Sequence, residues 1–404
     1  MEKVVIIRYG EIGLKGKNRI FFEKKLVANI KNTFKGSKVS RRRGRIILTY
    51  SEENSENIVG KMKKIFGIQN FSIGFYVDFD QKTIEKVCCD LANYNYEKGK
   101  KTFRVNTNRA NKSFPIRSMD FSALMGEKVL ASNPELSVDL HDPDFYIGID
   151  IREKGTYIFT DKINGAAGLP VGVSGRGLLL LSGGIDSPVA GWYAMKRGIS
   201  IDCIHFSSPP YTSDEALNKV LDLAKILTSF NGGRPLMFYS VNFTEAQVSI
   251  QRSVKPSISL VVQRRFMMKV CNSVCDSFNY KAVISGESVG QVASQTLENI
   301  FSIDDACKKL VIRPLITFDK IDTIKLSKEI GTYETSILPF EDSCTVFVPD
   351  SPATKTRIKS LKREEELYEE EELLENTVNT IKIFKLIDGK IEGSDTFENI
   401  KKNL

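Results

Sequence analysis

The chain has 404 residues, more than one typical domain of roughly 150 residues, so two or three folded domains are expected. Hydrophobic residues make up 41% and charged residues 27%, with a formal net charge of +8, which excludes a largely disordered or fibrous protein. No segment approaches the ~18 consecutive apolar residues of a membrane helix, and the N-terminus lacks a signal peptide's apolar run, so a cytoplasmic protein without a membrane partner is expected.

Residues 1–56 are predicted to form a small α+β domain. Apolar, β-branched runs at 3–9 and 45–50 indicate strands, with a basic helix near 18–33 between them. Residues 1–50 contain fourteen Lys or Arg and three Asp or Glu, so a polyanion, with nucleic acid as the leading candidate, is the expected partner. Closely spaced guanidinium groups at Arg41, Arg42 and Arg43 could bind successive phosphates, and the alternative is a solvated turn.

Residues 57–165 are predicted to form a second α+β domain. Helices are expected near 57–66 and 117–131, and strands near 70–79, 101–107, 136–140, 145–151 and 155–160. The segment 106–115 is rich in amides, hydroxyls and cations. Arg109 and Lys112 could contact phosphate and sugar oxygens of RNA, and Phe114 could stack on a base, although a polar loop needs no ligand.

A glycine-rich linker at 166–177 separates these domains from a third one at 178–354. Short apolar strands at 178–181, 199–206, 236–241 and 281–284, separated by helical stretches, predict an α/β fold with a doubly wound parallel sheet. Residues 355–404 contain an acidic helical run and are predicted to be a helical appendage.

The chemistry is predicted to lie in Ser182-Gly183-Gly184-Ile185-Asp186-Ser187-Pro188, which follows four leucines and precedes a helix. Paired glycines allow positive φ and close approach of an anion, and the Ser182 and Ser187 hydroxyls and helix-start N–H groups can donate to phosphate oxygens. Asp186 would be repelled by phosphates unless a cation stood between them, which points to Mg²⁺. The alternative is a plain strand-to-helix turn. A near-match to the ordinary nucleotide loop, at residues 10–18, has the wrong glycine spacing and is rejected.

This motif resembles the PP-loop of ATP pyrophosphatases, which cleave ATP to AMP and pyrophosphate. Residues 1–355 as a whole resemble the tRNA 4-thiouridine synthetase (tRNA uracil 4-sulfurtransferase) family. Arg109-Ala-Asn-Lys-Ser-Phe-Pro115 and Asp144-Phe-Tyr-Ile-Gly-Ile-Asp150 are similar to that family's THUMP domain. The resemblance implies a ferredoxin-like N-terminal domain, an RNA-binding THUMP domain and a PP-loop domain, in that order.

The resemblance also implies the positions of the site residues. Segments 205–212, 285–296 and 313–320 match the family and follow predicted strands, so they belong at the ligand-binding edge of the sheet. ATP would be surrounded by the motif residues together with Leu180, Leu181, His205, Phe206, Arg264, Gly286 and Gln295. Lys320 would supply positive charge to the phosphates during adenylation. Without the family, the apolar members could simply be core residues, and Arg264 could lie on a helix surface.

Seven cysteines at irregular spacing, without a C-x-x-C pair, fit a reducing compartment and give no structural zinc site. By resemblance, Cys344 in Glu341-Asp-Ser-Cys344-Thr carries sulfur as a persulfide loaded by a cysteine desulfurase. The expected product is 4-thiouridine at tRNA position 8. The family often dimerises, so a homodimer is expected. No rhodanese-like domain follows residue 355, which puts in doubt a second role in thiamine biosynthesis through a sulfur-carrier protein.

Three other functions are weighed. An amide-forming PP-loop ligase would need no basic RNA-binding domains, and the chain has no room for a glutaminase domain. A different tRNA thiolase would usually carry paired cysteines. A non-catalytic RNA-binding module would have no use for the intact residues of the PP-loop motif.

Overall fold

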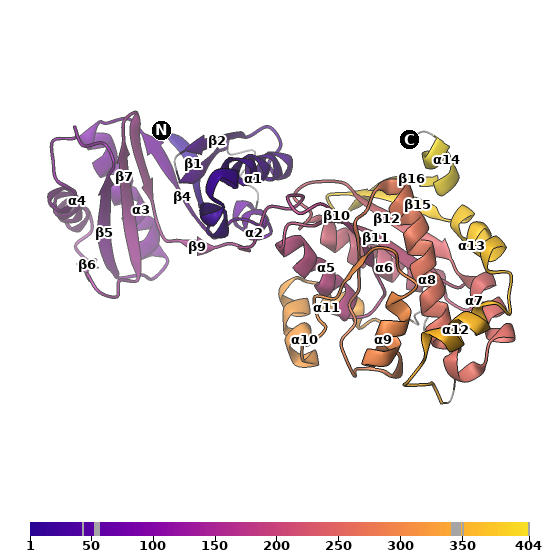
Figure 1. Cartoon of the computed structure of the whole chain (residues 1–404). Coiled ribbons are helices and arrows are strands. Elements are labelled where there is room, and N and C mark those ends of the chain that lie inside the picture. Colours follow the sequence, from indigo (N-terminus) through magenta and orange to yellow (C-terminus); the bar gives the residue numbers. More distant parts are fainter. Residues whose placement is uncertain (43, 52–56, 341–348, 350, 403–404) are drawn as a thin grey trace. The chain divides into compact units, whose positions relative to one another are not determined.

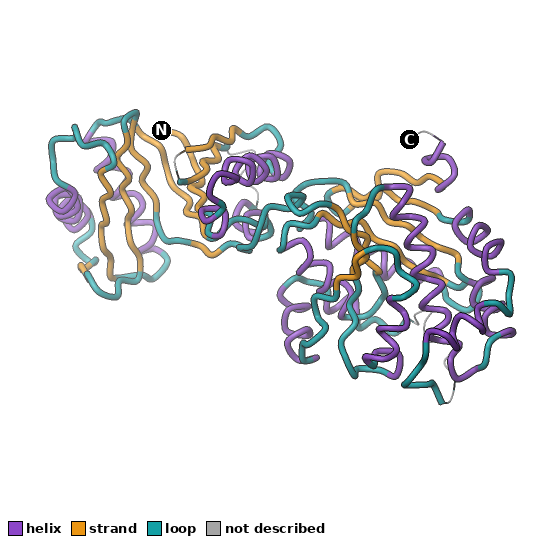
Figure 2. Tube along the Cα trace, viewed as in Figure 1, coloured by secondary structure: helices purple, strands orange, loops and turns teal. Residues whose placement is uncertain are grey.

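The computed structural model describes residues 1–42, 44–51, 57–340, 349 and 351–402. The chain divides into two compact units, Met1–Gly168 and Leu169–Leu404 (Figure 1). Each unit is built on its own sheet, with helices packed against it (Figure 2). None of the helices in these described ranges is both long and apolar enough to cross a membrane.

The described residues of the first unit contain nine strands that form one sheet. They are β1 (Glu2–Arg8), β2 (Lys38–Arg42), β3 (Arg45–Thr49), β4 (Asn70–Val77), β5 (Thr102–Arg109), β6 (Ser137–Val138), β7 (Phe145–Arg152), β8 (Gly155–Phe159) and β9 (Ile163–Asn164). The strand order is β2-β3-β1-β4-β8-β7-β5-β6, and β9 pairs with β4. The two α+β domains expected from the sequence thus share a continuous sheet, because β4 pairs with β1 on one side and β8 on the other.

Helices cover one face of this sheet. They are α1 (Arg19–Thr33), α2 (Ile58–Lys63), α3 (Gln81–Glu97) and α4 (Ser118–Ser132). Alternation along the strands separates the two faces: Val5 and Ile7 pack in the helix-covered core, whereas Val4 and Ile6 join a small cluster on the opposite, open face. The two faces of the sheet therefore carry separate apolar clusters.

The sequence patterns did not predict β2, α3 or the short strand β9. Strand β2 contains Arg41 and Arg42, which were expected at the entry to the strand at 45–50, with a solvated turn as the alternative. Helix α3 has no counterpart among the predicted elements. Its N-cap is Asp80, whose carboxylate accepts a hydrogen bond from the Thr83 backbone N–H at 2.9 Å.

Within its described ranges, the second unit has seven strands in a mixed sheet. They are β10 (Arg176–Leu180), β11 (Ser200–Ser207), β12 (Leu236–Asn242), β13 (Ala282–Ile284), β14 (Leu310–Ile312), β15 (Lys382–Ile387) and β16 (Lys390–Thr396). The order is β14-β13-β10-β11-β12-β15-β16, and the first five strands are parallel. Strand β11 is buried along all but its last residue, which is typical of a parallel strand covered on both faces of the sheet. The predicted doubly wound parallel sheet is confirmed.

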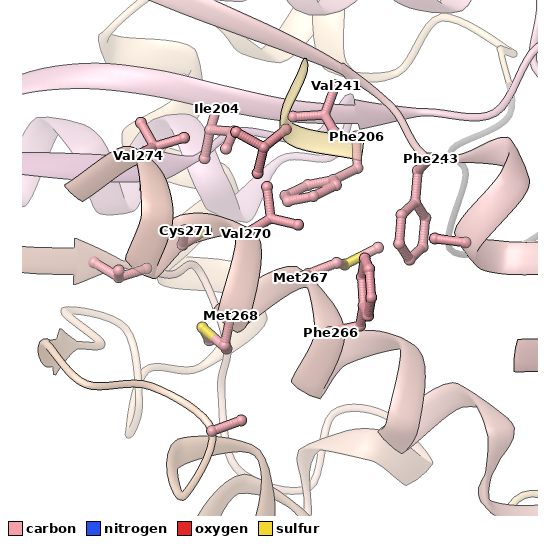
Figure 3. Close-up of a cluster of buried hydrophobic side chains, with 14 of the residues drawn as sticks. Ile204, Phe206, Val241, Phe243, Phe266, Met267, Met268, Val270, Cys271 and Val274 are labelled. Carbon is pink, nitrogen blue, oxygen red and sulfur yellow. The ribbon is translucent and has the colours of Figure 1, made fainter. Parts of the chain in front are cut away.

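The helices of this unit pack on both faces of the sheet. They are α5 (Asp186–Lys196), α6 (Asp214–Thr228), α7 (Thr244–Ser253), α8 (Pro256–Phe278), α9 (Leu297–Asp304), α10 (Lys320–Glu329), α11 (Tyr333–Ser336), α12 (Ile358–Glu365), α13 (Glu370–Asn379) and α14 (Phe397–Lys402). Helices α5, α6, α10 and α11 contact one another, and α8 contacts α7, α9, α12 and α13. The core beside α8 includes Phe206, Val241 and Phe266 (Figure 3).

The C-terminal residues differ from the expected helical appendage. Helices α12 and α13 are followed by a hairpin, and its first strand, β15, pairs antiparallel with β12. Ile383 and Leu386 of β15 are buried, so this segment completes the core of the second unit. The side chain of Arg265, 1% exposed, donates from Nε to Glu365 Oε1 at 2.7 Å and ties α12 to α8. The short apolar run of β15, Ile383-Phe384-Lys385-Leu386-Ile387, was overlooked beside the more conspicuous acidic run.

Candidate nucleotide site and RNA-facing surface

The predicted phosphate loop, residues 182–187, lies at the carboxyl end of β10. In the strand order, β11 and β12 lie on one side of β10, whereas β13 and β14 lie on its other side. The direction of the strand order therefore reverses between β10 and β13. Ligands of doubly wound sheets bind at such a reversal. The loop after β10 and the Ser285-Gly286-Glu287 segment after β13 meet there.

The loop is held in shape by its own hydroxyl groups. The Ser182 backbone N–H donates to Ser187 Oγ at 3.0 Å, and Ser187 Oγ donates to the Ser182 carbonyl at 3.2 Å. Ser182 Oγ in turn accepts a hydrogen bond from the Gly184 N–H at 3.3 Å. The two serines thus brace the turn itself, in addition to the anion-binding role expected from the sequence.

The expectation that the paired glycines of the loop adopt a positive φ is wrong. Neither Gly183 nor Gly184 has a positive φ in the described structure, so backbone strain does not demand glycine at either position. Gly286 is the sterically required glycine. A Cβ at Gly286 would lie 2.7 Å from the Ser187 backbone nitrogen and 2.8 Å from the Asp186 carbonyl carbon.

We expect Gly286→Ala to weaken ATP binding at least about tenfold, because the added methyl group must push the phosphate loop away from the β13 end. Isothermal titration with a non-hydrolysable ATP analogue measures the effect. Gly393→Ala on β16 is the control, since a Cβ there meets nothing within 4 Å. Unchanged nucleotide affinity in Gly286→Ala would show that the loop does not need this close contact.

Asp186 and Lys320, both predicted to be catalytic, form an ion pair. Lys320 Nζ lies 2.6 Å and 2.7 Å from the two carboxylate oxygens of Asp186. Gln291 Nε2 also donates to Asp186 Oδ2, at 3.0 Å. Asp186 begins α5 and Lys320 begins α10, so the structure brings together two residues 134 positions apart.

The predicted nucleotide residues, apart from Gly183, line a single cleft. These residues are Leu180, Leu181, Ser182, Gly184, Asp186, Ser187, His205, Phe206, Arg264, Gly286 and Gln295. The cleft is also lined by residues that the sequence analysis did not select: Ile204, Met267, Met268, Ser285, Glu287 and Ile303. Its apolar wall is continuous with the core, as Phe206, Met267 and Met268 show (Figure 3). The apolar wall can accommodate a flat base, and the glycine-serine loop can accommodate phosphates.

His205 has a structural contact within this cleft. Its Nδ1 lies 3.0 Å from the Leu181 carbonyl oxygen, which can only accept a hydrogen bond, so Nδ1 carries the proton in this contact. The side chain is 5% exposed. His205 therefore ties the end of β11 to the start of the phosphate loop.

The chain approaching Cys344 begins beside the phosphate loop. Ser336 Oγ donates to the Gly184 carbonyl at 3.4 Å, and Lys219 Nζ donates to the Leu338 carbonyl at 2.7 Å. Cys344 itself lies outside the described residues, so its predicted role remains a prediction.

Four described cysteines of the second unit are poor nucleophiles. Burial raises the pKa of the Cys275 thiol to about 12 and raises the pKa values of Cys203 and Cys271 well above the ordinary value. Cys307 is half-buried, and burial raises its pKa too. A thiolate is disfavoured at each of these four positions at neutral pH.

The predicted RNA-binding residues lie at several places on the first unit. Arg41 and Arg42 are exposed on β2, and Arg43 lies outside the described residues. Lys112 is exposed, whereas Phe114 is half-buried, with its ring edge-to-face against Phe121 at 5.1 Å between centroids.

Arg109 supports the loop that follows β5. Its Nη1 donates to the Phe114 carbonyl at 2.8 Å and to the Ile116 carbonyl at 3.3 Å. These bonds give Arg109 a local structural role beside the predicted one.

A second cleft lies on the first unit and contains cations that sequence spacing did not bring together. Its residues are Arg8, Arg45, Arg104, Asn106, Asn108, Pro143, Tyr146, Gly148, Ile149, Asp150, Phe159 and Lys162. Arg45 forms an ion pair with Asp150, and the Arg8 guanidinium lies 5.0 Å from the centre of the Phe159 ring. Burial and the neighbouring Arg45 lower the pKa of Arg8, so an anion in this cleft would stabilise the charged guanidinium.

Three family models match the chain in succession. The ThiI ferredoxin-like domain matches residues 4–72, the THUMP domain matches 79–161, and the model described as Thiamine biosynthesis protein (ThiI) matches 172–370. The order agrees with the resemblance inferred from the motifs.

Relatives of the same type match over nearly the whole chain. A probable tRNA sulfurtransferase of Brevibacillus brevis is 43% identical over 378 residues, covering 93% of this chain and 94% of the relative. One of Thermotoga maritima is 43% identical over 387 residues, covering 96% and 99%.

Among solved structures, a crystal structure of a 4-thiouridine synthetase–RNA complex with bound ATP matches with a TM-score of 0.91 and 42% identity. The match covers 96% of this chain and all of that one. The chain belongs to the tRNA sulfurtransferase (ThiI) family, the 4-thiouridine synthetases inferred from its motifs.

Proposed function

We propose that this chain is an ATP-dependent tRNA sulfurtransferase that converts uridine at position 8 of tRNA into 4-thiouridine. The observation that carries the proposal is the cleft at the end of β10, where a serine-glycine loop, the Asp186–Lys320 pair and an apolar wall meet. The related 4-thiouridine synthetase with bound RNA and ATP supports the choice of both substrates.

In the first step, uracil O4 attacks the α-phosphorus of ATP. An O–P bond forms to the uracil oxygen, the bond from the α-phosphorus to the bridging oxygen breaks, and pyrophosphate leaves toward loop 182–187. The ammonium group of Lys320 stabilises the negative charge that develops on the phosphates. The original carbonyl oxygen now belongs to AMP, a good leaving group.

Asp186 is the residue that would hold Mg²⁺. Nowhere in the described residues do three or more His, Cys, Asp or Glu side chains gather as a metal site, so phosphate oxygens and waters would supply the remaining ligands. A single carboxylate with substrate phosphates is a common Mg²⁺ arrangement. The ion would neutralise charge on the leaving pyrophosphate.

In the second step, sulfur replaces the activated oxygen. A cysteine desulfurase loads Cys344 as a persulfide, and its terminal sulfur attacks C4 and expels AMP. An external thiol then cleaves the S–S bond, which releases 4-thiouridine and leaves a disulfide. Alternatively, the external thiol first releases sulfide from the persulfide, and sulfide attacks C4. An external thiol is chosen because burial disfavours the thiolates of Cys203, Cys271, Cys275 and Cys307.

The same persulfide could load a thiamine-pathway sulfur-carrier protein, which the description of the family model suggests. We also propose that the chain forms a homodimer, as expected from the family. Light scattering of the purified chain measures its oligomeric state.

The first unit is proposed to bind the tRNA through its open sheet face and the Arg8 cleft. Lys162→Ala should weaken tRNA binding about threefold to tenfold and reduce the salt dependence of log Kd by about one charge, because phosphate contacts release counterions. Lys162 is exposed at the cleft. Filter binding at several salt concentrations measures both effects.

Lys86→Ala is the matched control, since Lys86 is an exposed lysine on α3, which packs against the opposite face of the sheet. Equal effects of the two substitutions would mean that general charge, and not this cleft, determines tRNA binding.

The overall activity is tested by incubating the chain with ATP, tRNA and a sulfide source. Thiolated uridine together with AMP supports the proposal. AMP without any change in the RNA would indicate another adenylating enzyme, and neither product would indicate a non-catalytic RNA-binding protein.

A further inference from the structure

One guanidinium N–H of Arg264 has no hydrogen-bond acceptor among the described residues. Arg264 lies on α8 and lines the cleft, and its Nη1 donates to Glu287 Oε1 at 2.6 Å. Its Nε is buried and has no hydrogen-bond partner among the described residues. A buried N–H without an acceptor is unfavourable, so the Arg264 guanidinium has hydrogen-bonding capacity that the described residues do not use.

Glu287, in the segment after β13, holds Arg264 through this ion pair. The side chain of Glu287 is 7% exposed, and its second oxygen, Oε2, accepts from Arg313 Nε at 2.7 Å. Arg313 is itself fixed by Asp304, whose two oxygens accept from its Nη1 and Nη2 at 2.9 Å and 2.6 Å. The carboxylate of Glu287 is thus shared between two arginines and cannot rotate freely.

The charge state of Glu287 follows from these neighbours. Burial alone would raise its pKa, but Arg264 and then Arg313 outweigh burial and hold the pKa below the usual value. Glu287 is therefore ionised at neutral pH and can orient both guanidinium groups.

The surroundings of Arg264 indicate which part of a nucleotide it meets. Met267 and Met268, three and four positions further along α8, line the same cleft and are apolar. The phosphate loop, by contrast, presents serine hydroxyls and glycine backbone. An adenosine moiety fits the apolar wall, and pyrophosphate fits the loop.

We infer that Glu287 is a positioning residue for the nucleotide, which orients the Arg264 guanidinium group toward an acceptor of the adenosine moiety. The inference rests on the proposed use of this cleft for ATP and adds to it the residue that orients Arg264. Glu287 acts through Arg264, since both of its oxygens are occupied by arginines.

The test compares binding of AMP and of pyrophosphate by isothermal titration. Glu287→Gln keeps the shape of the side chain but removes its charge. We expect it to weaken AMP binding about tenfold, to leave pyrophosphate binding within about twofold, and to raise KM for ATP more than it lowers kcat. Arg264→Met should weaken AMP binding by a similar factor.

The double variant separates positioning from a general loss of structure. If Glu287 acts through Arg264, Glu287→Gln should have little further effect on AMP binding once Arg264→Met is present. Glu365→Gln is the matched control: this glutamate is similarly buried and is paired with Arg265 and Lys269, but it does not line the cleft. It should lower the melting temperature without changing AMP affinity.

Three results would overturn the inference: wild-type AMP affinity in Glu287→Gln, full additivity in the double variant, or an equal loss of AMP and pyrophosphate binding. A wild-type chain that binds neither ATP nor AMP would instead refute the proposed function, on which the inference rests.

Discussion

Asp186→Ala is expected to reduce tRNA-dependent release of pyrophosphate from ATP at least about a thousandfold, because it removes electrostatic preorganisation at the reacting phosphates. Lys320 is held by both oxygens of this carboxylate, so its ammonium group would lose its fixed position. The proposed Mg²⁺ ligand would be lost as well. A coupled assay for pyrophosphate measures the rate.

The tRNA affinity of Asp186→Ala should stay within about twofold of wild type, since the proposed RNA-binding face lies on the first unit and the substitution lies in the second. Asp214→Ala is the control, because Asp214 is an exposed aspartate in the first turn of α6. Equal loss of tRNA binding and of pyrophosphate release would contradict the catalytic role of Asp186.

Cys344→Ser is expected to adenylate tRNA but to form no detectable 4-thiouridine from a desulfurase, because a hydroxyl group cannot carry a persulfide. AMP and pyrophosphate should still appear in the presence of tRNA. A high concentration of free sulfide should partly restore thiolation, since sulfide can attack the activated C4 directly. Mass spectrometry of the digested tRNA measures the product.

Cys307→Ser is the control for Cys344→Ser. Cys307 is half-buried in the second unit and has a raised pKa. Desulfurase-dependent thiolation by Cys344→Ser at the wild-type rate would remove Cys344 from the mechanism.

The phosphate loop at 182–187 could be predicted from its own residues, whereas the family resemblance supplied the Gly286 segment and the other cleft residues. Both segments follow buried strands, and ligands bind where the strand order reverses, so they lie together. Asp186 and Lys320 were each predicted to act at the phosphates, but no contact between their side chains was predicted. The direct contact requires the fold, because α10 and α5 are far apart in the sequence.

Glu287 shows why the rest could not be predicted. It lies inside a segment already chosen as part of the site, but a buried carboxylate is unfavourable unless cations neutralise it. Those cations, Arg264 and Arg313, lie 23 and 26 residues away in the sequence. No local pattern shows that both arginines reach the same carboxylate.

The cleft that contains Arg8, Arg45 and Arg104 on the first unit was missed for a similar reason. Arg8, Arg104 and Lys162 lie on or beside strands from distant parts of the chain, and only the order of the sheet brings them to one cleft. The sequence analysis favoured the consecutive arginines at 41–43 because clustering in sequence is easier to recognise than clustering across a sheet.

The central claim is that loop 182–187 accepts pyrophosphate while a tRNA oxygen captures AMP. Supplying ATP labelled at the α-phosphate, with tRNA but without any sulfur source, and separating the products tests it most directly. The account predicts label in AMP-tRNA or free AMP, formed only when tRNA is present, with one pyrophosphate released for each AMP. Labelled ADP as the product, or AMP formation that ignores tRNA, would contradict it.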